Sequence, residues 1–174
     1  MDTDCRIFLG ALMLQRQNYA AAKQYIDVVL DENWTHLNAN ILLGLLYKLT
    51  NWPEMSRKHF AIAKATRMRS LGLLAPKSSI PKNFRTEAIE FKVEIIDYKK
   101  VKTVDEQLTG KDCDLLYFDL IDFLLERTIY GVADMALNFI SDKNTARYLM
   151  AKAQIRVLQT EYREATEALD RLLE

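Results

Sequence analysis

The side chains that could take part in chemistry are few and lie far apart in the sequence. The chain has two histidines, His36 and His59, and no His-Glu-x-x-His pattern that could bind zinc. Cys113 lies between two aspartates at a predicted helix start, where the helix N-terminus lowers a thiol pKa and neighbouring carboxylates raise it. We interpret the histidines as structural or surface residues and expect no activated thiol. The sequence therefore predicts no catalytic residue, metal or cofactor, and a protein that is not an enzyme.

The composition excludes several classes of protein. The 174 residues are 49% hydrophobic and 28% charged, with 24 basic and 24 acidic side chains. A formal net charge of zero gives no overall attraction to nucleic acid or to an anionic membrane. Two cysteines cannot form a disulfide framework, and no apolar run approaches the roughly 18 residues of a membrane span. We therefore expect a cytoplasmic protein without nucleic-acid or membrane partners.

The elements that must position these residues repeat at a fixed offset. Leu9-Gly10 and Leu43-Gly44 lie 34 positions apart, and residues of matching class follow in the same register. The further pairs are Met13 with Tyr47, Ala22 with Ser56, Ile26 with Phe60 and Val29 with Ala63. Small residues let two helix backbones approach closely, and bulky residues at helical spacing fill the groove between neighbouring helix pairs. One such pair cannot bury its apolar face alone, so the pattern predicts stacked pairs.

This pattern resembles the tetratricopeptide repeat (TPR), a 34-residue unit of two antiparallel helices. The resemblance implies an all-α fold, a right-handed α-solenoid of antiparallel helix hairpins. Its structural positions here are Leu9, Gly10, Ala22, Leu43, Gly44, Tyr47, Ser56, Phe60, Ala133 and Ala165. The chain departs from the family at Arg6 and Asn40, where an aromatic residue is usual, and it lacks the proline that ends each repeat.

We expect about nine helices in one continuous solenoid domain. Residues 1–70 form two regular TPR units, 71–112 form an irregular insert of a loop and a long helix, and 113–174 form two degenerate units. The expected helices cover residues 3–16, 19–31, 37–50, 53–70, 84–103, 113–127, 129–141, 144–159 and 162–173. The expected caps are Thr3 or Asp4, Pro53 and Asp112. The loop near 72–83 contains two prolines, and it is either a plain insertion or a strap folded back into the concave groove.

The charges are segregated along the chain. Residues 53–102 carry 12 basic and five acidic side chains, whereas residues 103–126 carry seven acidic side chains and one lysine. We interpret these segments as solvated faces that compensate each other. A basic docking patch for an acidic partner is the alternative. Nucleic acid is not expected, because no aromatic interleaving or binding motif accompanies the basic residues.

TPR arrays bind peptides or helices on the concave surface lined by the first helix of each pair. By this resemblance the candidate partner-binding residues are Ile7, Ala11, Leu14, Asn38, Ile41, Leu45 and Lys48. Such an apolar surface suits an amphipathic helix. Chaperone C-terminal carboxylate tails are not expected as partners, because Ile7, Ala11 and Leu42 replace the cationic and amide clamp. The alternative is that the chain itself covers these residues.

The expected function is that of a noncatalytic scaffold that holds a protein partner and supports a larger complex. The insert and the Lys/Tyr-rich irregular units resemble the TPR regions of cilia- and flagella-associated proteins, which implies an axonemal complex in the cilium. The alternatives are a regulatory TPR subunit of an intraflagellar-transport or ubiquitin-ligase assembly, and an enzyme that uses Cys113. The last apolar helix reaches Glu174 without a polar capping helix, so we expect a piece of a longer protein.

Overall fold

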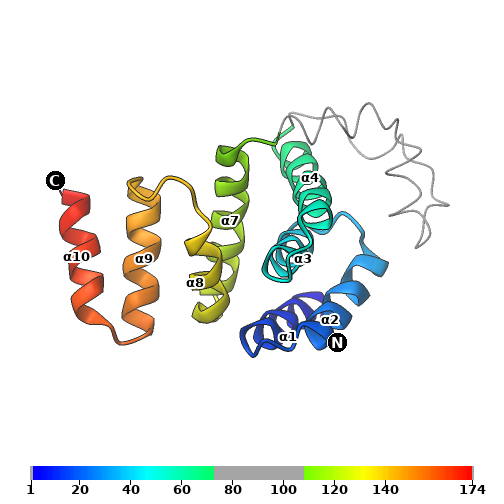
Figure 1. The fold of residues 1–174 in the computed structure, drawn as a ribbon, viewed down its shortest axis with the longest axis horizontal. Helices are drawn as coiled ribbons and strands as arrows, with labels where there is room; N and C mark the ends of the chain where they lie inside the picture. Colours follow the sequence, from blue (N-terminus) through cyan, green and yellow to red (C-terminus); the bar gives the residue numbers. More distant parts are fainter. Residues whose placement is uncertain (1, 73–107, 174) are drawn as a thin grey trace.

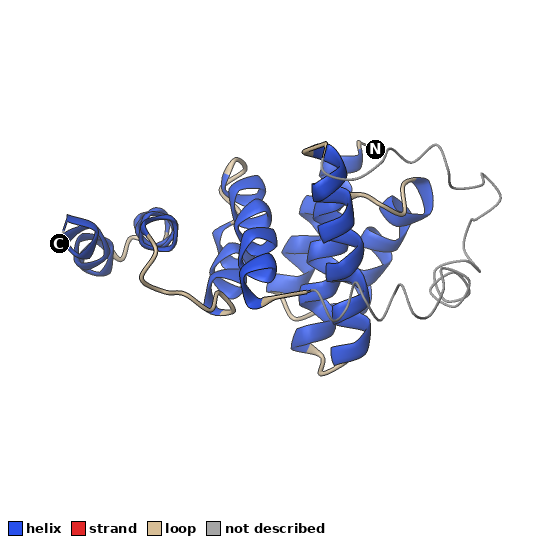
Figure 2. Cartoon of the chain, turned by 90° about the horizontal axis from the view of Figure 1, so that it is seen from above, coloured by secondary structure: helices blue, strands red, loops and turns tan. Residues whose placement is uncertain are grey.

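The computed structural model describes residues 2–72 and 108–173, and every regular element in these ranges is a helix (Figure 2). The helices are α1 Thr3–Gln15, α2 Tyr19–Glu32, α3 Leu37–Leu49, α4 Pro53–Ser70, α7 Gly110–Leu125, α8 Tyr130–Asn138, α9 Ala146–Leu158 and α10 Tyr162–Leu173. The expected all-α class is confirmed. None of these helices has the length and hydrophobicity needed to cross a bilayer. The helix expected over 84–103, and the loop beyond Gly72, lie outside the described residues.

The ends of the helices follow from their caps. Pro53 occupies the first turn of α4, as predicted. Asp112 was expected to cap the next described helix, but Thr109 does so, and α7 therefore begins at Gly110 rather than 113. The Thr109 hydroxyl accepts from the Asp112 amide at 3.2 Å, and the Asp112 carboxylate accepts from the Thr109 amide at 2.8 Å. The expected cap of α1 is also wrong, because Asp2 precedes the helix and makes no side-chain capping bond.

Consecutive helices pack in pairs, α1 with α2, α3 with α4, α7 with α8 and α9 with α10 (Figure 1). Small residues lie where the helices of the first two pairs cross. A Cβ atom on Gly10 would lie 3.0 Å from the Ile26 side chain, and one on Gly44 would lie 3.2 Å from the Phe60 ring. The Ser56 hydroxyl donates a 2.8 Å hydrogen bond to the Gly44 carbonyl, which ties α3 to α4 at this point.

All four pairs share one turn geometry. In each turn a left-handed residue follows the end of the first helix, and the next amide bonds back to a carbonyl five residues earlier, as in a Schellman motif. The left-handed residues are Gln17, Asn51, Thr128 and Thr160, with φ of 60°, 62°, 56° and 63°. The closing bonds are Asn18 to Met13 at 2.9 Å, Trp52 to Tyr47 at 2.8 Å, Ile129 to Leu124 at 3.0 Å and Glu161 to Arg156 at 2.8 Å. The same hairpin therefore occurs four times in the described chain.

The first three hairpins close on one another. Helix α3 contacts α1 and α7, and α1 reaches past α3 to contact α8. The Phe8 ring stacks on Phe123 with centroids 4.7 Å apart, and the Arg127 guanidinium lies 5.7 Å from the Phe8 centroid. Gln15 packs over Gly131, where a Cβ atom would collide with it. The hydrophobic core passes through this contact and continues into α9.

Ion pairs add a polar edge to the contact between α4 and α7. Lys64 pairs with Asp112 at 2.8 Å, and Arg67 pairs with Asp119 at 2.7 Å. Two basic residues of α4 thus neutralise two acidic residues of α7, in agreement with the expected compensation between these segments. The side chains are partly exposed, so each pair adds at most about 1 kcal/mol of stability and mainly sets how the helices align.

The packing at Gly44 gives a direct test of the hairpin. Gly44→Leu should lower the free energy of unfolding by about 2 kcal/mol or more, because the new side chain must displace Phe60 and separate α3 from α4. Gly110→Ala is the matched control, since its Cβ would lie at an ordinary 3.6 Å from the Ser141 hydroxyl. Urea unfolding followed by circular dichroism measures both. Equal unfolding midpoints for the two variants would contradict the crossing.

Candidate partner-binding groove

The residues expected to bind a partner do not form an open surface. Ile7, Ala11, Leu14, Ile41 and Leu45 are fully buried, because α1 and α3 pack against the third hairpin. They are core residues, and the expectation of an open concave groove along α1 and α3 is corrected. Of the two alternatives left by the sequence, coverage by the chain itself agrees with this burial.

The two polar residues of the expected surface lie elsewhere. Asn38 is half-buried in the first turn of α3. Lys48 is exposed, and its ammonium lies 4.5 Å from the Phe139 ring centroid and 5.6 Å from that of Tyr117. These cation–π contacts hold Lys48 against its own chain rather than presenting it to a ligand.

An apolar groove of about 670 Å³ lies between α7, α9 and α10. Its lining residues are Asp122, Leu125, Glu126, Met150, Ala153, Gln154, Val157, Leu158 and Leu169. Among them, Met150 is 51% exposed, Val157 47% and Leu169 44%. Large apolar side chains gathered in one exposed concavity are typical of interaction sites.

Helix α9 forms the floor of this groove. Met150, Gln154 and Val157 follow one another at i, i+4 and i+7 and therefore share one helix face. The residues on either side of that face are buried: Leu149 and Ala153 on one side, and Ala151 and Ile155 on the other. Helix α9 therefore has buried residues on both sides of its exposed strip.

The small residues of α10 set the second wall. Ala165 and Ala168 are buried, and α10 packs against α9. Their short side chains let α10 lie close to α9, with Leu169 next to them at the edge of the groove. Helix α7 supplies the third side with Leu125 and its acidic neighbours.

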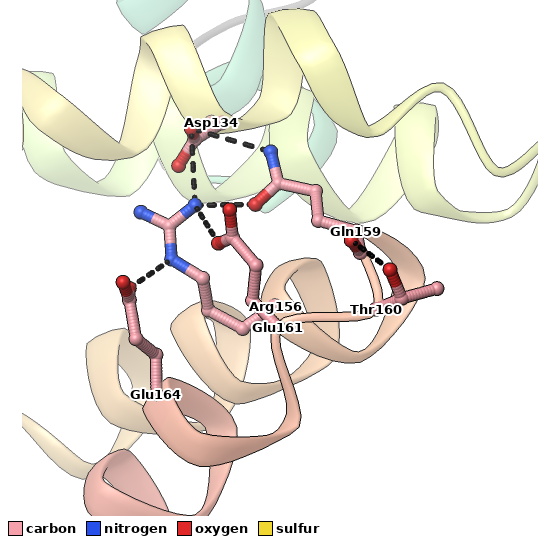
Figure 3. Close-up of polar contacts among 6 residues, drawn as sticks. All are labelled: Asp134, Arg156, Gln159, Thr160, Glu161 and Glu164. Carbon is pink, nitrogen blue, oxygen red and sulfur yellow. Dashed lines mark hydrogen bonds and ion pairs between the residues drawn. The ribbon is translucent and has the colours of Figure 1, made fainter.

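Two arginines near the ends of α9 hold it in place. Arg156 joins α8, α9 and α10 (Figure 3): its Nε lies 2.9 Å from a Glu164 oxygen, and its Nη1 lies 3.3 Å from both Asp134 and Glu161. Arg147 pairs with Asp122 of α7 at 2.7 Å. The last hairpin is thus tied to the third by charged contacts at both ends of α9, with the groove beside them.

The residues first considered for chemistry have structural surroundings. The His36 ring nitrogen accepts a 3.4 Å hydrogen bond from the Ala39 amide and caps α3. His59 is buried, with Nδ1 2.9 Å from the Asn40 side-chain oxygen. Burial, together with the Asp112 and Asp114 carboxylates, raises the pKa of the Cys113 thiol despite nearby lysines. Within the described ranges, no three His, Cys, Asp or Glu side chains gather as a metal site.

The groove residues were not predicted from the sequence, although the pattern of apolar residues in α9 indicated them. Helix α9 carries apolar residues on several of its faces. Met150 and Val157 lie on one face, with Leu149 to one side of it and Ala151 to the other. One partner helix in a hairpin covers only one face, so a helix that is apolar on more sides indicates a further contact. The repeat register directed attention to α1 and α3 instead.

The buried imidazole predicts a pH dependence of stability. Burial, with the nearby Lys23 and Lys58 charges, lowers the pKa of His59 to about 4. An unfolded histidine titrates near pH 6.5, so the unfolded chain binds the extra proton first and stability is lost as the pH falls from about 6.5 toward 4. The full loss is about 3 kcal/mol. Urea unfolding between pH 7 and pH 4.5 should show a weaker pH dependence for His59→Gln. An NMR titration midpoint of His59 near 6.5 would overturn the prediction.

The Arg156 cluster predicts a local effect on the last hairpin. Arg156→Met should cost about 2 kcal/mol and speed amide exchange in α9 and α10, because Asp134 loses its ion pair while partly buried. Arg163→Met is the matched control, since Arg163 is almost fully exposed and, among the described residues, pairs with Glu167 alone, one turn away in α10. Hydrogen–deuterium exchange should separate the two variants, and equal exchange would count against the cluster's role.

Comparisons with known proteins identify no relative. No protein-family model, no curated protein and no solved structure matches the chain. The resemblance to tetratricopeptide repeats, and the narrower one to cilia- and flagella-associated proteins, therefore stay predictions from the residues.

Proposed function

We propose that this chain is a noncatalytic scaffold that binds an amphipathic helix of a partner protein in the groove between α7, α9 and α10. The observation that carries the proposal is the meeting of Met150, Val157 and Leu169, all near half exposed, in one apolar concavity. A helix with apolar anchors at i, i+3 or i+4 and i+7 suits such a surface. Covering these side chains removes apolar area from water, which provides the driving force for binding.

The hairpin geometry supports the wider part of the proposal, a TPR-like solenoid that helps to assemble a larger complex. Four helix pairs share one turn, and the first two cross at glycines 34 positions apart. Two further points belong to the same proposal: a cytoplasmic location, which rests on the composition, and a ciliary location with an axonemal complex as partner, which rests on the sequence resemblance alone.

A synthetic peptide tests the groove. The probe is a fluorescent amphipathic helix with a leucine face and glutamine flanks, and its affinity is measured by anisotropy. The double variant Met150→Asp, Val157→Asp should weaken binding about tenfold or more, since each buried aliphatic contact is worth roughly 1.5–3 kcal/mol and charge in an apolar groove is costly. Its circular dichroism spectrum should stay helical, because both side chains are half exposed.

Val28→Asp is the matched control for exposure. Val28 lies on α2, 43% exposed and outside the lining of the groove, so its replacement should leave peptide binding unchanged. The proposal fails if the wild-type protein does not bind the peptide, or if Val28→Asp weakens binding as much as the groove variant does.

A further inference from the structure

The polar residues of the groove are all acidic or neutral. The polar members of the lining are Asp122 and Glu126 of α7 and Gln154 of α9, and no lysine or arginine lines the groove in the part of the chain that the structure describes. A partner that covers the apolar floor must therefore bring its own polar flank next to carboxylates. The charge of that flank depends on which of these carboxylates are not already paired within the chain.

Most acidic side chains of α7 are already neutralised by the chain. Asp112 pairs with Lys64, Asp119 with Arg67 and Asp122 with Arg147. Asp114 accepts hydrogen bonds from the Ser141 amide and hydroxyl. These carboxylates serve the packing of α7 and have little attraction left for a partner.

Glu126 is different. It is exposed and lines the groove at the C-cap of α7, and its carboxylate makes no hydrogen bond or ion pair with the residues that the structure describes. The negative end of the α7 dipole adds to its charge, since the last turn of α7 holds no basic residue. The adjacent Arg127 is directed to the Phe8 ring of α1. A negative charge that no described residue neutralises therefore lies on one wall of the apolar groove.

We infer that the partner helix carries lysine or arginine on the flank that faces α7, where it pairs with Glu126 while its apolar face covers Met150, Val157 and Leu169. The inference rests on the proposed function, because it names the chemistry of the helix that enters the same groove. Such a rim pair contributes mainly specificity and association rate, and an acidic flank at this position is repelled.

Three peptides with one leucine face test the inference, with lysine, glutamine or glutamate on one flank. The wild-type protein should bind them in the order lysine, glutamine, glutamate, with about two- to fivefold between steps, the range of exposed ion pairs. High salt should compress the differences, because exposed charges are screened. Glu126→Lys should reverse the order. Glu54→Lys, the same charge change on exposed Glu54 of α4 outside the groove, should preserve it.

The outcomes separate the inference from the proposed function. Equal affinity for the three peptides, or an order unchanged by Glu126→Lys, overturns the inference, while the loss of binding in Met150→Asp, Val157→Asp still supports the groove. Absence of binding by all three peptides overturns both. Sedimentation that shows a wild-type dimer dissociated by Val157→Asp makes a second copy of the chain the occupant and overturns the inference.

Discussion

The closure of the first three hairpins around α1, α3 and α7 is the constraint on which the rest of the structure depends. Glycines at the crossings bring the helices of the first two pairs close together, and α1 then reaches the third hairpin through the stacked rings of Phe8 and Phe123. Since α1 contacts α8, the apolar residues on the inner faces of α1 and α3 are not accessible to solvent. The contact between α1 and α8 thus makes the surface that was expected from the sequence to bind a ligand a part of the core.

The last hairpin joins the same apolar core as the others through Tyr148, Leu149, Ala151 and Ile155 of α9, and ion pairs add to its contact with the third hairpin. Helices α9 and α10 bury small residues between themselves, whereas Arg147 and Arg156 link α9 to the third hairpin. Ion pairs at the two ends of a helix fix its position without covering the apolar residues between them. Met150 and Val157 therefore stay exposed next to a well-ordered frame, which is the condition for a preformed binding surface.

Much of the helical organisation was readable from the sequence, and the site was not. Periodicity and the 34-residue register predicted the helix pairs, and the bounds of α4 and α10 agree with expectation. Thr109 and Asp112 are both good capping residues, and only their mutual hydrogen bonds show which one begins α7. A repeat register identifies residues that share a helix face, but it carries no information on the curvature of the stacked hairpins. The return of α1 onto α8 depends on that curvature, so the burial of Ile41 and Leu45 could not be predicted.

The four left-handed turn residues have a consequence for the tolerance of the chain to change. Gln17, Asn51, Thr128 and Thr160 hold a conformation that costs a side-chain-bearing residue roughly 1–2 kcal/mol, and the two threonines are β-branched. None of them is glycine, so each connection retains a local cost that the surrounding packing offsets. Replacing these four residues by glycine would relieve that cost and raise the thermal stability without changing the residues that line the groove.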